Sequence, residues 1–211
     1  MIDLIWVTRI SDEEDRWLEE NLAGLDKRYR VSIVGHTNLD QNKYRFNYYE
    51  FWEDGVDEAG LICHKKNIAV KNATQKYCLI LHSDVTPKSD FYDLAISREY
   101  DNNTAVAPYA FVRTASFDEM GQIKEQHVRS FTWCDIQNPF RHKSFLSPQD
   151  DWTYISGAGI FGQTELFKKH KWNENLSHGK EEDLEYSLRL TKSGVKLVAD
   201  EYLMLDSRRS Q

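Results

Sequence analysis

The chain has 211 residues, of which 40% are hydrophobic, 29% are charged and 13% are aromatic, and its formal net charge is −7. This length and composition predict one globular domain and exclude an intrinsically disordered chain. The absence of a basic stripe excludes a typical nucleic-acid binder, and no apolar run approaches the roughly 20 residues that cross a bilayer.

Strands and helices are predicted to alternate over residues 1–110. Four apolar runs predict short strands, at residues 4–7, 31–34, 77–81 and 104–107. A capping box of Ser11 and Glu14 opens a helix after the first strand, and further helices are predicted at 62–73 and from Ser89 onward. Residues 40–58 are polar and aromatic, and we expect a loop or lid there. This alternation is typical of a parallel sheet that is covered on both faces.

The second half of the chain is predicted to be mixed. Residues 111–117 and 123–131 flank a turn and predict a β-hairpin, whereas 132–153 is interpreted as an irregular loop. After this loop we expect a Gly-rich strand at 157–162 and a short helix from Thr164. A second helix is predicted at 180–192, and a last strand at 195–199. The predicted fold is α/β: a Rossmann-like, mainly parallel twisted sheet flanked by helices, with a small antiparallel hairpin.

Polar residues at strand ends are the first candidates for a ligand site, because ligands bind beyond the carboxyl ends of parallel strands. His82, Ser83 and Asp84 follow the most strongly predicted strand, and His36 follows the second strand. The carboxylate of Asp84 can bind Mg²⁺ or Mn²⁺ through oxygen. The structural alternative is that Asp84 caps a helix or closes a turn.

Two acids, Glu182 and Asp183, lie in the opening turns of a predicted helix. One of these carboxylates can act as a general base that accepts the proton of an attacking hydroxyl group. The structural alternative is that both acids stabilise the helix dipole, by about 0.3–1 kcal/mol each.

The Gly-rich segment is the third candidate. Gly157, Ala158 and Gly159 predict that the backbone comes close either to a helix or to a sugar ring. Trp152 and Tyr154, just before this segment, are candidates for stacking on a sugar or for packing in the core.

Two blocks of the sequence resemble the family 2 GT-A glycosyltransferases. The first block, Lys66 to Ala73 with Tyr77 to Asp84, is similar to the family pattern RNxGixxA…yixfLDsDD. The second block is similar to GgxxxfrrxxfxxvGgfDE…gEDxDLslRl, and it comprises Ile155 to Phe161, Trp172 to Glu174 and Glu182 to Arg189. The order and spacing of the two blocks are intact, and the resemblance covers almost the whole chain.

The resemblance implies a fold, an activity and an organisation. It implies a GT-A enzyme that moves one sugar from a nucleotide-diphosphate sugar, which we expect to be a UDP-sugar, to a glycan or lipid-linked acceptor. Synthesis of a bacterial surface polysaccharide is the expected role. We expect a single domain over 1–211, in which 1–110 binds the donor and 111–211 binds the acceptor and carries the catalytic residues.

The resemblance also implies roles for individual residues. Asp183 is expected to be the base of an inverting reaction, Glu182 is expected to contact the acceptor, and Trp152 and Tyr154 are further acceptor candidates. Asp84 is expected to hold a divalent metal, Mn²⁺ or Mg²⁺. Donor contacts are expected at Thr8, His36, Lys66, Asn67, His82, Ser83, Asp84, Gly157, Ala158 and Gly159.

Three positions depart from the family pattern. His82 replaces the first acid of the Asp-x-Asp motif, and the segment from Gly35 to Asn38 replaces D-[DN]-x-S. The family's metal-binding histidine after the last strand is missing, and Asp206 lies near its place. One hypothesis is that a His and an Asp have exchanged places, so that Asp84 and Asp206 hold the metal beside His82. The alternative is that metal binding is weak or lost.

Two other functions fit parts of the sequence. A non-catalytic GT-A relative that binds a sugar or a nucleotide agrees with the altered Asp-x-Asp motif, but not with the intact Glu182-Asp183 pair. A nucleotidyltransferase shares a similar sheet, but it usually has a Gly-rich basic loop after the first strand, and the segment from Thr8 to Ser11 has no glycine.

The cellular location is predicted from the N-terminus and the cysteines. The chain begins Met-Ile-Asp-Leu-Ile-Trp, without the basic and apolar regions of a signal peptide. Its three cysteines are odd in number and lack metal-ligand spacing, which favours a reducing compartment. We expect a cytoplasmic protein, with the inner face of the membrane as the alternative.

Overall fold

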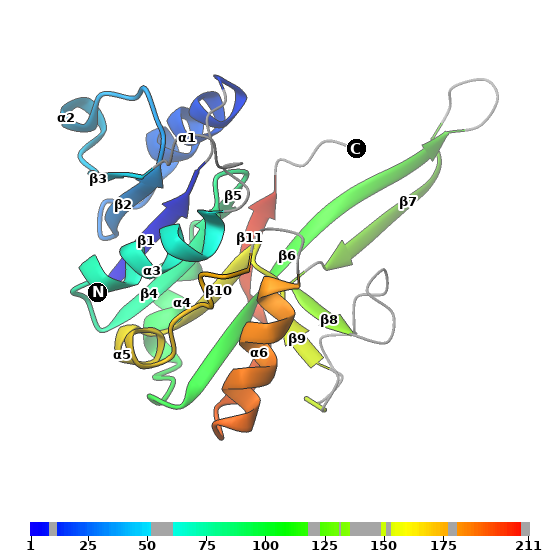
Figure 1. The fold of residues 1–211 in the computed structure, drawn as a ribbon. Helices are drawn as coiled ribbons and strands as arrows, with labels where there is room; N and C mark the ends of the chain where they lie inside the picture. Colours follow the sequence, from blue (N-terminus) through cyan, green and yellow to red (C-terminus); the bar gives the residue numbers. More distant parts are fainter. Residues whose placement is uncertain are drawn as a thin grey trace.

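The computed structural model describes residues 1–8, 12–51, 61–117, 123–130, 132–135, 149–150, 153–176 and 181–207, with the backbone alone for 111–117, 123–130 and 135. One large sheet organises these residues (Figure 1). Its strands, in spatial order, are β3 (Asn47–Glu50), β2 (Arg30–Gly35), β1 (Ile2–Val7), β4 (Tyr77–His82), β10 (Gly159–Gln163), β6 (Thr104–Phe117), β11 (Lys196–Ser207) and β5 (Val85–Pro87).

The sheet is mainly parallel, as predicted. β3, β2, β1, β4, β6 and β11 run in one direction, whereas β10 runs antiparallel to its neighbours β4 and β6. β5 runs antiparallel to β11, and β7 (Ile123–Ser130) pairs antiparallel with β6. The predicted hairpin is therefore confirmed as β6–β7, and Figure 1 shows it extending away from the sheet.

Helices cover both faces of the sheet. α1 (Asp12–Gly24) and α4 (Phe91–Ser97) pack on one face, and α3 (Ile62–Asn72), α5 (Thr164–Lys169) and α6 (Glu182–Lys192) pack on the other. Successive residues of β1 alternate between the two cores: Leu4 and Trp6 join one, and Ile5 and Val7 join the other. Every residue of β1 is buried for this reason. None of the described helices is long and apolar enough to cross a membrane.

The strands and helices predicted in the first half of the chain are confirmed. Leu18 of the first helix is buried in the core; Ser11 of its capping box lies outside the described residues. In the second half, the last helix begins at Glu182 and is followed by Gly194 at φ +81°. The predicted strand at 157–162 begins only at Gly159, because Gly157 and Ala158 form a turn.

Two segments predicted to be loops contain regular structure. Residues 40–58 include α2 (Gln41–Tyr44), whose N-cap Asp40 accepts hydrogen bonds from the N–H groups of Asn42 and Lys43, and the edge strand β3. The segment 132–153 includes β8 (Trp133–Asp135) and ends at the first residue of β9 (Thr153–Ile155), and these strands form a second, two-stranded sheet. The loop prediction was wrong at these elements, because β3 has no buried apolar run and β8 finds its partner far along the chain.

Candidate functional site

Four strand ends meet at one edge of the large sheet. Val7 pairs with Val34 and with His82, so β1, β2 and β4 end at the same level. Gly159 at the start of β10 pairs with Leu81 near the end of β4. The antiparallel insertion of β10 thus brings the Gly-rich turn to the edge where a parallel sheet binds its ligands.

Asp183 lies in the first turn of α6, and its carboxylate reaches the Gly-rich turn. Its Oδ2 accepts a hydrogen bond from the Gly157 N–H at 2.5 Å, and its Oδ1 accepts one from Lys66 Nζ at 2.9 Å. A Cβ atom on residue 157 would lie 2.5 Å from Asp183 Oδ2 and 2.8 Å from Lys66 Nζ. Only glycine leaves room for this arrangement. The carboxylate stays 19% exposed, so it can still meet a ligand.

The ammonium group of Lys66 is enclosed by protein. Its side chain is only 1% exposed, and Nζ lies 5.6 Å from the centre of the Trp172 ring. Lys66 was expected to contact the donor. In the structure, its ammonium group forms an ion pair with Asp183, which belongs to the second sequence block that resembles the family.

Three consecutive residues of α3 bind three separate parts of the chain. Lys65 Nζ donates to the Thr8 carbonyl at the end of β1 at 2.8 Å, whereas Lys66 binds Asp183. Asn67 Nδ2 donates to the Trp172 carbonyl at 3.0 Å, and Asn67 Oδ1 accepts from the Trp172 N–H at 2.9 Å. Successive helical residues point about 100° apart, so the short Lys-Lys-Asn sequence ties these parts together. The Asn67 side chain was expected to contact the nucleotide sugar, and in the structure its amide binds the Trp172 backbone instead.

The loop after β2 is held by a residue that the sequence did not reveal. Asp15 of α1 accepts hydrogen bonds from Thr37 Oγ1 at 2.6 Å and from the Asn38 N–H at 3.0 Å. Thr8 Oγ1 donates to the carbonyl of His36 at 2.7 Å, which brings the expected donor residues Thr8 and His36 together. Asp15 has the sequence signature of an ordinary first-turn acid, so no local signal identifies this role.

The residues expected to bind metal lie near one another in the sheet but form no ligand cluster. Asp84 is 6% exposed, directly before β5, and Asp206 of β11 pairs with Thr86 of β5. The Asp206 carboxylate forms an ion pair with Lys88. Among the described residues, no three His, Cys, Asp or Glu side chains are grouped so that they could hold a metal ion. His82, Asp84 and Asp206 form no such group, and metal dependence stays a prediction.

The backbone of the Gly-rich turn is joined to the end of β4, and Ser83 is joined to α1. The His82 N–H donates to the Ala158 carbonyl at 3.4 Å, and Asn21 Nδ2 donates to the Ser83 carbonyl at 3.3 Å. The first of these bonds connects two parts of the expected donor site through the main chain.

Two of the expected acceptor residues, Tyr154 and Glu182, lie among the described residues. Tyr154 of β9 is half-buried, and its pKa is raised first by burial, then by Cys134 and by the negative charges of Asp183 and Glu182. This places Tyr154 within electrostatic range of both acids. Glu182 itself is buried, 4% exposed. Trp152 lies outside the described residues.

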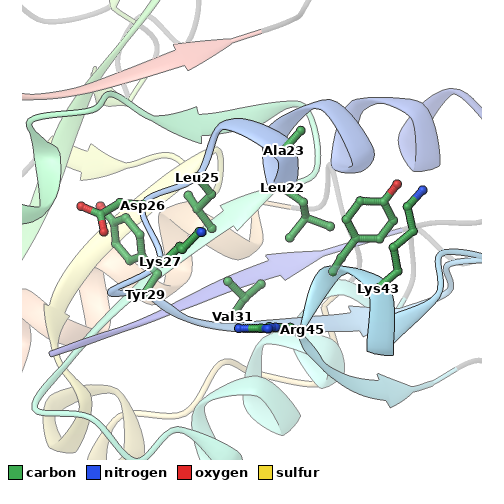
Figure 2. A pocket seen from close by; sticks show the side chains of 10 residues that line it. Leu22, Ala23, Leu25, Asp26, Lys27, Tyr29, Val31, Lys43 and Arg45 are labelled. Carbon is green, nitrogen blue, oxygen red and sulfur yellow. The ribbon is translucent and has the colours of Figure 1, made fainter.

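A pocket of about 370 Å³ lies away from this edge, between α1 and α2 near the amino end of β2 (Figure 2). Its walls combine apolar side chains such as Leu22 and Val31 with the cations Lys27, Lys43 and Arg45. None of the residues expected at the donor, acceptor or metal site lines this pocket. It is therefore separate from the candidate site.

Comparison with known proteins identifies the fold. No protein-family model matches the chain, and no curated protein matches it in sequence. Its structure is similar to that of S. aureus TarS, a GT-A-like family 2 glycosyltransferase, with a TM-score of 0.60 and 14% identity over 97% of this chain and 36% of that chain. The fold is GT-A.

Two shorter TarS structures agree. TarS 1–349 matches with a TM-score of 0.56 and 14% identity, over 97% of this chain and 60% of that one. TarS 1–349 in complex with UDP-GlcNAc matches with a TM-score of 0.55 and 15% identity, over 99% of this chain and 60% of that one. The chain thus spans 36% to 60% of the length of these neighbours.

Proposed function

We propose that the protein is a glycosyltransferase that moves one sugar from a nucleotide-diphosphate sugar to an acceptor hydroxyl. The observation that carries this proposal is the Asp183 carboxylate, which is held by Gly157 and Lys66 at the ligand-binding edge and is still partly exposed. A fold alone does not establish a function. The proposal therefore rests on this site together with the two sequence blocks that resemble the family.

In the proposed reaction, the acceptor oxygen attacks the anomeric carbon while the bond from that carbon to the diphosphate oxygen breaks. The electron pair of the broken bond leaves with the nucleoside diphosphate. The proton of the acceptor hydroxyl passes to a carboxylate oxygen of Asp183. Attack opposite to the leaving group inverts the anomeric centre. We assign Glu182 a contact to the acceptor.

We assign the donor to the edge where β1, β2 and β4 end beside the Gly-rich turn, and the acceptor to the side of Tyr154. Trp152 stays a predicted acceptor contact. A UDP-sugar is the first donor to test, because a structural neighbour was solved in complex with UDP-GlcNAc. The acceptor is proposed to be a glycan or a lipid-linked saccharide of surface polysaccharide synthesis, in a cytoplasmic setting. Mn²⁺ or Mg²⁺ is an expected cofactor on the resemblance alone.

The test combines donor binding with turnover. UDP-, GDP-, CMP- and dTDP-sugars are titrated in thermal unfolding with and without Mn²⁺, and UDP release from UDP-GlcNAc is measured. A donor at 100 times its Kd raises the free energy of unfolding by about 2.7 kcal/mol. Asp183→Asn is expected to slow UDP release by about 10²- to 10⁴-fold while donor binding persists.

The matched control lies on the same helix. Glu185→Gln removes one partner of a surface ion pair with Arg189, which contributes about 0.3–0.5 kcal/mol, and should leave UDP release unchanged. Donor binding without any turnover would favour the non-catalytic GT-A relative. No binding of any nucleotide sugar would contradict the donor site itself.

A further inference from the structure

We propose that Lys66 is a positioning residue for Asp183 and not a contact for the donor phosphates. This inference rests on the proposed function, because it gives Asp183 the role of base. The sequence suggested that Lys66 contacts the nucleotide sugar. We assign it the role of orienting the Asp183 carboxylate instead.

The burial of Lys66 supports this assignment. Its side chain is 1% exposed, and the Asp183 carboxylate 2.9 Å away neutralises it. A buried ammonium group is tolerated only beside such a partner, because charge is poorly solvated inside a protein. A donor phosphate could bind Lys66 only after this ion pair had opened and left Asp183 without its partner.

The geometry around Asp183 shows what the ion pair does. Lys66 holds Oδ1, and the Gly157 N–H holds Oδ2, so the two donors bind different oxygens. Two hydrogen bonds on two oxygens fix both the position and the plane of a carboxylate. Each oxygen keeps a further lone pair, and the side chain is 19% exposed. An approaching hydroxyl group therefore meets an acceptor of defined orientation.

The neighbours of Lys66 hold it in place. Lys65 and Asn67 bind Thr8 and Trp172, so α3 cannot slide without breaking these hydrogen bonds. The Trp172 ring faces the Lys66 ammonium and also stacks on Tyr186 of α6, with ring centres 4.0 Å apart and an interplanar angle of 11°. One aromatic ring thus links Lys66 to the helix that carries Asp183.

The experiment separates positioning from donor binding. The Kd for UDP-GlcNAc is measured by calorimetry, and kcat is measured as UDP release with water as the acceptor. Lys66→Met is expected to lower kcat by about 100-fold, the loss that a displacement of about 1 Å can cause. Its Kd is expected to stay within about twofold, as for an interaction that acts only on the chemical step.

Three further variants sharpen this comparison. Lys66→Met combined with Asp183→Asn should be no slower than Asp183→Asn alone, because Lys66 acts through that carboxylate. Lys66→Arg retains the positive charge and should restore part of kcat. Lys71→Met, at an exposed position of the same helix, should change neither value.

The proposal is overturned if Lys66→Met raises the Kd while kcat persists, or if its loss adds in full to that of Asp183→Asn. Should Lys66→Met fail to fold, Lys66→Arg carries the same test, because it keeps the buried charge and changes only its geometry: kcat should fall while the Kd stays within about twofold. A wild-type protein that neither binds nor hydrolyses any of the tested nucleotide sugars contradicts the proposed function instead. The coupling of Lys66 to Asp183 is then measured by a double-mutant cycle in thermal unfolding, and additive effects would overturn it.

Discussion

The ammonium group of Lys66 and the carboxylate of Asp183 lie 2.9 Å apart, although 117 positions separate them in the chain. Each residue belongs to one of the two sequence blocks that resemble the family 2 GT-A glycosyltransferases. Their contact shows that these blocks meet at a common place, where α3, the Gly-rich turn and the start of α6 come together.

Gly157→Ala should damage the candidate site. The new Cβ atom would lie 2.5 Å from Asp183 Oδ2, so the carboxylate or the turn has to move. We expect a loss of about 1–3 kcal/mol in the free energy of unfolding, measured by denaturant titration, together with a slower UDP release. Gly24→Ala is the control: a Cβ there meets no atom within 4 Å, and the change should be neutral or slightly stabilising.

Asp15→Asn should weaken binding of the nucleotide sugar without changing Asp183, the proposed general base. Asp15 holds Thr37 and Asn38 in the loop after β2, and hydrogen bonds to a charged group contribute about 1.5–3 kcal/mol. We expect the affinity for UDP, measured by calorimetry, to fall by about 10-fold. Asp12→Asn removes an exposed acid from the same helical turn and should leave the affinity unchanged. An equal effect of both variants would point to helix stability instead.

Metal binding can be decided by a direct measurement. If Asp84 and Asp206 hold Mn²⁺, replacing either residue by Ala should weaken Mn²⁺ binding by at least about 10-fold, as measured by calorimetry of the metal alone. Asp90→Ala, an exposed acid nearby, is the control. Unchanged affinity in Asp206→Ala would exclude the exchange of a His and an Asp, and would leave Asp206 as the ion-pair partner of Lys88.

The three thiols should be inert in the folded protein. Cys63, Cys78 and Cys134 are all buried, and burial raises the pKa of Cys63 and of Cys134 to about 12. With such a pKa, only about one thiol in 10⁴ is ionised at a pH of about 8, and the thiolate is the reactive form. We expect no reaction with an aromatic disulfide reagent until the chain unfolds, and then three equivalents. Rapid labelling of the native protein would contradict the burial of these three cysteines.

The sequence predicted those features that depend on local pattern. β1 and β4 are continuous apolar runs because both faces of the sheet are covered, and such burial can be read from a few adjacent residues. β3 escaped prediction because an edge strand with half-buried tyrosines has neither an apolar run nor an alternating pattern. The pairing of β8 with β9 also escaped, because its two strands are far apart in the sequence.

The candidate site was predicted in part for the same reason. The sequence by itself determined the alternation of strands and helices, the Gly-rich turn and the acids that open α6. Only the tertiary structure decided that β10 lies antiparallel between β4 and β6, and this position brings Gly157 to Asp183. It also decided that Lys66 is buried against Asp183 and that Asp15 holds the loop after β2. Local pattern reports how deeply a residue is buried, whereas its partner depends on chain crossovers that join residues distant in sequence.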